Sequence, residues 1–168
     1  ANLFLQGVID TRNRPMDDKM VEWLFKNPLS DGGQFTGVSD IIGKYGLVPR
    51  EVMNETYSAN NTARIAFLIK LKLREYGLQL RELPAKTKAS VIEAKKAEML
   101  TTVYRMLALA FGEPPTEFTW TRKDAKGNPV ETKTYTPKSF YDEYIGDDLT
   151  GDYVMLMNDP SRPYYKLY

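Results

Sequence analysis

The chain has 168 residues, of which 42% are hydrophobic and 27% are charged, with a formal net charge of +1. This length is enough for a domain with a buried core, and the near-balanced charge argues against a strongly electrostatic partner for the chain as a whole. With no cysteine there is no disulfide framework, and no apolar run reaches membrane-spanning length. We therefore expect no membrane partner, and we predict no cofactor and no metal site.

The first part of the chain predicts two short helices. Residues 2–10 resemble the tail of a helix, and Pro15 suits the first turn of the next one. Asp17 and Asp18 would then lie near the positive end of the helix dipole. The dipeptide Asn27-Pro28 ends this helix, because the residue before a proline disfavours helical geometry.

A glycine pair, Gly32-Gly33, precedes a third helix over residues 34–45. Two adjacent glycines leave backbone that another chain can approach closely, since no Cβ stands in the way. Gly46 supplies a left-handed stop for the helix. Apolar residues recur through it at helical spacing: Phe35, Val38, Ile41, Ile42 and Tyr45.

The middle of the chain predicts a pair of long antiparallel helices. Asn60 or Asn61 can cap the first, which Pro84 closes. A Ser90 to Glu93 capping-box pattern opens the second, which Gly112 stops. Apolar residues fall on one side of each helix: Ile65, Ile69, Leu73, Tyr76, Leu80 and Leu83, then Ile92, Met99, Val103, Met106 and Ala110. Residues 106–111 are apolar all round, which predicts burial.

The last third changes from helical to strand periodicity. Residues 118–122 and 130–135 alternate in polarity around a turn-forming cluster at 123–129, which predicts a β-hairpin. Thr136-Pro137 then indicates the start of a short helix, and residues 153–157 indicate one further strand. The fold class predicted is α+β and mainly helical, with a long helix pair and a β-hairpin.

The residue types needed for several catalytic mechanisms are absent. The chain has neither Cys nor His, so a thiolate nucleophile with an imidazole base cannot come from it. The acidic cluster of Asp147, Asp148 and Asp152 lacks the spacing of a calcium loop, and we interpret it as a solvated loop. No catalytic residue is therefore predicted within these 168 positions.

The chain nevertheless resembles the bleomycin hydrolase or aminopeptidase C branch of the papain-like cysteine peptidases. The resemblance begins at Asp31-Gly32-Gly33-Gln34 and at Lys44-Tyr45-Gly46-Leu47-Val48-Pro49. It continues to the end of the chain through these motifs: Glu55-Thr56-Tyr57-Ser58, Lys72-Leu73-Arg74-Glu75, Leu109 to Gly112, Pro114-Pro115, Glu117-Phe118-Thr119-Trp120, Thr136-Pro137, Phe140-Tyr141, Asn158-Asp159-Pro160 and Tyr165-Lys166-Leu167-Tyr168.

This resemblance implies an internal fragment of a cysteine aminopeptidase, inactive alone, that acts on peptide substrates. In the family the nucleophilic Cys and an oxyanion-hole Gln lie upstream of the glycine pair, and the His and Asn lie downstream. Residues 1–57 would belong to the papain-like helical lobe and residues 58–168 to a family-specific insert. The family also implies a homo-oligomer of six subunits and a cytoplasmic location, although any targeting segment would lie upstream of Ala1.

The same resemblance implies a substrate-binding strip. Gly32 and Gly33 would pair through their backbone with the substrate main chain, as an added strand does. Gln34 and Phe35 would border the pocket for the substrate side chain. From spacing alone, a tight turn into the helix is the favoured interpretation of the glycine pair, and Phe35 could equally be a core residue.

Two other interpretations concern the helix pair. Residues 64–105 carry a formal charge of +6, from Lys or Arg at 64, 70, 72, 74, 81, 86, 88, 95, 96 and 105 and Glu at 75, 82, 93 and 98. Solvated helix faces explain this most simply, and a nucleic-acid surface is the minority interpretation because no aromatic residues are interleaved for stacking. The competing function for the whole chain is a non-enzymatic α+β interaction module with a basic helix pair.

Overall fold

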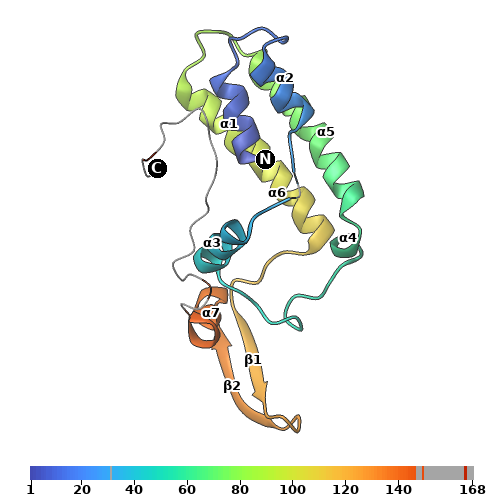
Figure 1. The fold of residues 1–168 in the computed structure, drawn as a ribbon, viewed down its shortest axis with the longest axis vertical. Coiled ribbons are helices and arrows are strands. Elements are labelled where there is room, and N and C mark those ends of the chain that lie inside the picture. The colour runs from blue at the N-terminus through green and yellow to red at the C-terminus, as the bar shows by residue number, and fades with distance from the viewer. Residues whose placement is uncertain (31, 147–148, 150–164, 166–168) are drawn as a thin grey trace. The chain divides into compact units, whose positions relative to one another are not determined.

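The computed structural model describes residues 1–30, 32–146, 149 and 165. The chain divides into two compact units, the first formed by residues 1–32 and 53–114 and the second by residues 33–52 and 115–168. The first unit is helical, and the second combines two helices with a two-stranded antiparallel sheet (Figure 1). The predicted α+β class is confirmed.

The first unit is built around a pair of long helices. It contains α1 (Asn2–Asp10), α2 (Lys19–Lys26), α4 (Tyr57–Asn60), α5 (Thr62–Arg81) and α6 (Ala89–Phe111). Helices α5 and α6 run antiparallel beside each other, as predicted, and α1 packs against both (Figure 1). Their buried faces form one apolar core: Phe4, Leu5, Val8, Leu24, Ile69, Leu73, Tyr76, Leu80, Ile92, Met99 and Val103.

Two predicted helix starts are wrong. Helix α2 begins at Lys19, not around Pro15, because Asp18 is its N-cap and accepts hydrogen bonds from the backbone N–H of Met20 at 2.9 Å and of Val21 at 3.3 Å. Helix α6 begins at Ala89, so Ser90 lies inside its first turn and cannot act as the cap.

The predicted burial of residues 106–111 is also wrong for this chain. Met106 is partly buried against the core, but Leu107 is exposed and Leu109 is 90% exposed. Helix α6 extends past the core residues with this apolar end, and Gly112, at φ +86°, terminates it as predicted.

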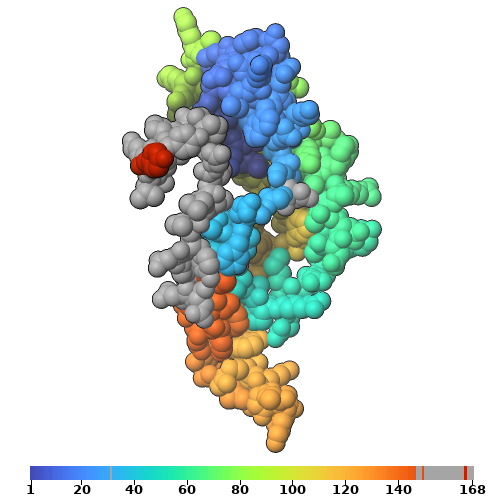
Figure 2. All heavy atoms as spheres, in the orientation of Figure 1, coloured from blue at the N-terminus to red at the C-terminus, as the bar shows by residue number. Residues whose placement is uncertain are grey.

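The second unit contains α3 (Phe35–Tyr45), β1 (Phe118–Lys123), β2 (Pro129–Tyr135) and α7 (Pro137–Tyr144). The strands pair in antiparallel register from Phe118 opposite Tyr135 to Arg122 opposite Glu131, as the predicted hairpin requires. The hairpin forms a narrow orange projection in Figure 2. Its turn is closed by Asp124, whose carboxylate accepts from the backbone N–H groups of Lys126 and Asn128.

Helix α7 starts as predicted, at a capping box. The Thr136 hydroxyl accepts from the Ser139 backbone N–H at 3.1 Å, and the Ser139 hydroxyl accepts from the Thr136 backbone N–H at 2.9 Å. Aromatic rings from the hairpin and α7 pack on one another: Phe118, Trp120, Tyr135, Phe140 and Tyr144. This cluster holds α7 against the hairpin.

The predicted strand at 153–157 and the acidic residues Asp147, Asp148 and Asp152 lie outside the described residues. The division into two compact units does not test the assignment of residues 1–57 to a papain-like lobe and residues 58–168 to a family-specific insert. That assignment stays a prediction. Among the described residues, no helix is long and apolar enough to cross a membrane.

Candidate substrate-binding segment

The described residues leave open space beside Gly32 and Gly33. Among them, apart from the chain neighbours of each glycine, a Cβ added to Gly33 would meet no atom within 4 Å, and one added to Gly32 would meet only the Ser30 Oγ, at 3.9 Å. Gly33 is also not among the described glycines with positive φ, which are Gly46, Gly112, Gly127 and Gly146. Packing within the described part of the chain therefore does not require glycine at either position.

The glycine pair lies on exposed, non-helical backbone at a boundary in the chain. The Gly32 N–H donates to the Ser30 Oγ at 3.3 Å, within the first unit. Gly33 belongs to the second unit and leads into α3. Asp31, which precedes the pair in the family motif, lies outside the described residues.

Gln34 and Phe35 form the start of α3. Gln34 is the N-cap, and its carbonyl accepts from the N–H of Gly37 at 3.1 Å and of Val38 at 3.3 Å. Phe35 is the first helical residue and is 53% exposed. The core alternative for Phe35 is therefore wrong within this chain, and each of the four predicted residues is exposed.

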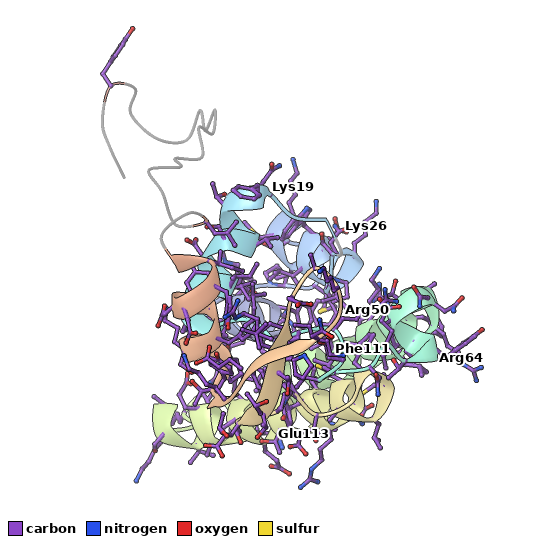
Figure 3. All side chains as sticks on the ribbon, turned by 90° about the horizontal axis from the view of Figure 1, so that it is seen from below. Lys19, Lys26, Arg50, Arg64, Phe111 and Glu113 are labelled. Atoms are coloured by element: carbon purple, nitrogen blue, oxygen red, sulfur yellow. The ribbon has the colours of Figure 1, made fainter. Side chains whose placement is uncertain are left out.

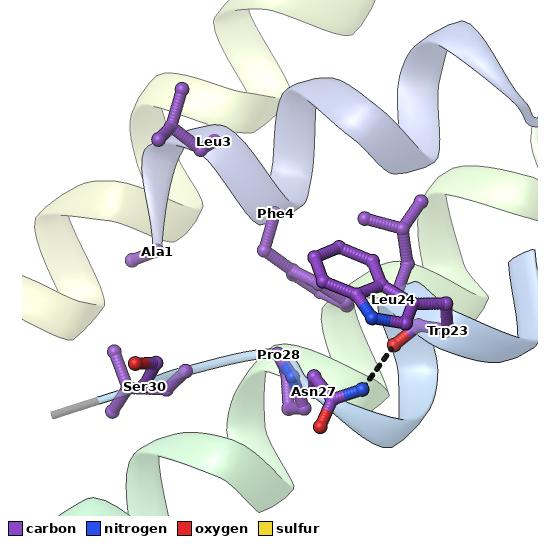
Figure 4. Close-up of a pocket in the computed structure, with 9 residues that line it drawn as sticks. Ala1, Leu3, Phe4, Trp23, Leu24, Asn27, Pro28 and Ser30 are labelled. Carbon is purple, nitrogen blue, oxygen red and sulfur yellow. Dashed lines mark hydrogen bonds between the residues drawn. The ribbon is translucent and has the colours of Figure 1, made fainter. Parts of the chain in front are cut away.

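A cavity in the first unit lies just ahead of the glycine pair in sequence. Its volume is about 280 Å³, and its walls are mainly apolar (Figure 4). Asn27 is held at the rim by a 3.1 Å hydrogen bond from its Nδ2 to the Trp23 carbonyl. The lining residues are Ala1, Leu3, Phe4, Trp23, Leu24, Asn27, Pro28, Leu29 and Ser30.

Sequence reasoning missed this cavity. Its walls come from α1, from α2 and from the segment after α2, and no motif connects those positions. The exposed indole of Trp23 on an otherwise amphipathic helix was the one available signal. The cavity can accept an apolar side chain, with the amide of Asn27 and the hydroxyl of Ser30 as polar groups at its edge.

The basic residues of the helix pair serve partly as structural donors. Arg74 donates through Nε to the Phe25 carbonyl at 2.8 Å, at the C-terminal end of α2. Arg81 donates to the Thr11 carbonyl at 3.1 Å, beyond the end of α1. Cations placed at helix C-termini satisfy carbonyls that have no partner inside the helix. Arg64, by contrast, projects outward from the ribbon, as do Lys19 and Lys26 on α2 (Figure 3).

No catalytic centre is visible in the described residues. The sequence lacks Cys and His, and no group of three or more acidic residues in the described ranges is placed to hold a metal ion. Two phenols among the described residues have a raised pKa. Burial, followed by the nearby Glu113 carboxylate, raises the pKa of Tyr104, and a hydrogen bond with the Tyr144 hydroxyl, followed by burial, raises the pKa of Tyr135. The raised pKa of Tyr135 keeps its phenol protonated and supports a structural role within the aromatic cluster.

The whole chain, residues 1–168, matches the sequence model of the Peptidase C1-like family. The chain belongs to this family, and the predicted resemblance to the aminopeptidase C branch of the cysteine peptidases is confirmed.

The relatives are named as aminopeptidases. The chain is 37% identical over 171 residues to Aminopeptidase C of Lactobacillus delbrueckii subsp. lactis, a match to 100% of this chain and 38% of that protein. It is 35% identical over 162 residues to Aminopeptidase C of Listeria monocytogenes, covering 96% of this chain and 36% of that protein.

The fold agrees with a solved structure of the same group. A crystal structure of pepw from Lactobacillus rhamnosis HN001 superposes with a TM-score of 0.81 and 39% sequence identity. The match covers 86% of this chain and 33% of that one. The chain thus spans little more than a third of the length of the proteins it matches.

Proposed function

We propose that this chain is a segment of a papain-like cysteine aminopeptidase, which removes residues from the N-termini of peptides. The nucleophilic Cys and its His partner would come from parts of the longer protein outside these 168 residues. The thiolate would attack the scissile carbonyl and expel the amine, and water would then hydrolyse the acyl-enzyme. Family membership and the names of the relatives support this class of reaction.

The segment would contribute the backbone along which the peptide substrate lies. The observation that carries this proposal is the open space beside Gly32 and Gly33, where the described residues leave room for a Cβ. Since the fold does not require these glycines, close approach by another backbone is a physical reason for them. The N–H and C=O groups would pair with the substrate as an added strand does.

Gln34 and Phe35 would border the pocket for the substrate side chain. Both are exposed, and the ring of Phe35 at the first turn of α3 offers an apolar surface directly after the glycine pair. The mechanism requires no role for Gln34 as an oxyanion donor, because the family's Gln for that role lies upstream.

Gly33→Val in the full-length enzyme tests the proposal. The added side chain would stand where the substrate backbone lies, so kcat/KM for an aminoacyl amide should fall at least tenfold. The thermal midpoint should change little, since the site is open and unstrained. The matched control is Gly37→Val, at a second open glycine four residues later. Wild-type kinetics in Gly33→Val would refute the binding strip.

The 168-residue chain on its own should be catalytically silent. Without thiol or imidazole there is no nucleophile for the two-step displacement. Incubation with fluorogenic aminoacyl amides should give no turnover above buffer. Turnover that survives repurification would contradict the proposal that the chemistry comes from elsewhere in the protein.

We also propose that α5 carries a surface for assembly with further copies of the protein. Four apolar side chains on this helix lie outside the core, each with 44% to 57% of its surface exposed: Phe67, Leu68, Leu71 and Leu78. Exposed apolar patches of this kind are typical of interfaces. Homo-oligomers, six subunits in this family, would cover them.

A further inference from the structure

The C-terminal end of α3 meets the first turn of α7 through backbone alone. Gly46 has φ +83°, and a Cβ there would overlap the Pro137 carbonyl and the Lys138 amide nitrogen. The next residue, Leu47, donates its backbone N–H to the Pro137 carbonyl at 3.0 Å. Only glycine combines this φ with so close an approach.

Helix α3 exposes most of its apolar side chains. Its apolar side chains Phe35, Val38, Ile41 and Tyr45 are at least half exposed. Its one buried residue is Ser39, whose hydroxyl donates to the Leu149 carbonyl. Among the described residues, the hydrogen bonds of Ser39 and of Leu47 therefore join this helix and the residue after its C-cap to the rest of the second unit.

Pro137, on the other side of the contact, is firmly held. It follows the capping residue Thr136 at the start of α7. The rings of Phe140 and Tyr144 pack with Trp120 of β1, with centroids 5.3 Å and 5.4 Å apart. The hairpin and α7 thus form a rigid support on which the end of α3 rests.

We infer that Gly46 is a positioning residue, through which the hairpin and α7 brace α3 and hold the backbone of Gly33 and Gln34 in its binding geometry. This inference rests on the proposed function. Helix α3 is continuous over eleven residues, so a displacement at Gly46 reaches Gly33, in the same unit, as a rigid-body movement. Movements of about 1 Å at a binding strip cost about a hundredfold in rate.

The test compares Gly46→Ala with Gly127→Ala in the full-length enzyme. Both glycines have nearly the same φ, +83° and +87°, but a Cβ at Gly127 meets no atom within 4 Å. Gly127→Ala therefore carries the cost of placing alanine at a positive φ, without the overlap of the added Cβ with other backbone atoms. Gly46→Ala should reduce kcat/KM for a dipeptide amide at least tenfold, mostly through KM, whereas Gly127→Ala should stay within twofold of wild type.

Two further readouts separate positioning from general damage. Amide hydrogen exchange over residues 35–47 should be faster in Gly46→Ala and unchanged in Gly127→Ala. The rate of inactivation by iodoacetamide, a small reagent that reports on the thiolate and its base, should stay at the wild-type value. If Gly46→Ala does not fold, Ser39→Ala replaces it, because it removes the hydrogen bond from the Ser39 hydroxyl to the Leu149 carbonyl. Ser39→Ala should then speed amide exchange over residues 35–47 and lower kcat/KM, each by two- to fivefold.

Each outcome decides the inference. Unchanged exchange over residues 35–47 overturns the brace, and faster exchange with unchanged kcat/KM overturns its role in positioning. A parallel loss of iodoacetamide reactivity also overturns it, since the defect would then not be confined to the binding strip. Failure of the proposed function is distinguishable, because Gly33→Val would then show wild-type kinetics whatever the exchange data for Gly46→Ala.

Discussion

The indole Nε1 of Trp120 donates a hydrogen bond to the Oε1 of Glu51 at 2.7 Å, linking two residues 69 positions apart. Both belong to the second unit, Trp120 on β1 and Glu51 on the segment that follows α3. The bond stabilises the ionised carboxylate and so lowers the pKa of Glu51. This hydrogen bond thus joins the hairpin to the segment that follows α3.

This bond predicts a pH-dependent contribution to stability. Because the folded-state pKa of Glu51 is lowered, its contribution is present above the unfolded pKa, about 4.3, and is lost as pH falls through the folded value. The difference in thermal midpoint between wild type and Glu51→Gln should be largest near neutral pH and shrink on acidification. Circular dichroism melts from about pH 3 to 7 measure it, and a difference that does not vary with pH would contradict the assignment.

Gly77→Ala should destabilise the first unit, although alanine is the better helix former. A Cβ on Gly77, within α5, would lie 2.8 Å from the Phe25 ring and 3.1 Å from the Phe4 ring. Those rings already pack edge to face with centroids 5.8 Å apart. Overpacking of about 1–3 kcal/mol exceeds the helix-propensity gain of about 1 kcal/mol, so the net loss should be on the order of 1 kcal/mol.

Denaturant unfolding monitored by circular dichroism tests this balance. Gly37→Ala is the control, since a Cβ there meets nothing within 4 Å and should leave stability equal or slightly raised. If Gly77→Ala were as stable as Gly37→Ala, the two rings would have room to move and the packing argument would be wrong.

Leu71→Asp should weaken assembly of the full-length protein without unfolding it. Leu71 is 47% exposed on α5, so the aspartate is solvated in the monomer but becomes an unpaired charge in an apolar contact. Light scattering or sedimentation should report smaller species. Ala125→Asp, which adds the same charge to the exposed hairpin turn, should leave the oligomer intact. An unchanged oligomer in Leu71→Asp would remove this face from the interface.

The sequence by itself determined the elements that depend on near neighbours. The spacing of Ile69, Leu73 and Leu80 defined the buried face of α5, and the turn cluster between the strands defined the hairpin. Thr136-Pro137 marked the start of α7. Hydrogen bonds in helices, caps and tight turns join residues a few positions apart, so the residues that form them stand together in the sequence.

The tertiary structure decided what depends on distant partners. Only the tertiary structure shows that the described residues leave open space beside Gly32 and Gly33, that Leu109 is exposed, and that Gly46 meets Pro137 about ninety positions later. The family resemblance implied Gly32 to Phe35 as candidate site residues, but nothing in the sequence indicated the cavity beside α2. Contacts between surfaces depend on which faces meet after folding, and local periodicity carries no information about that choice.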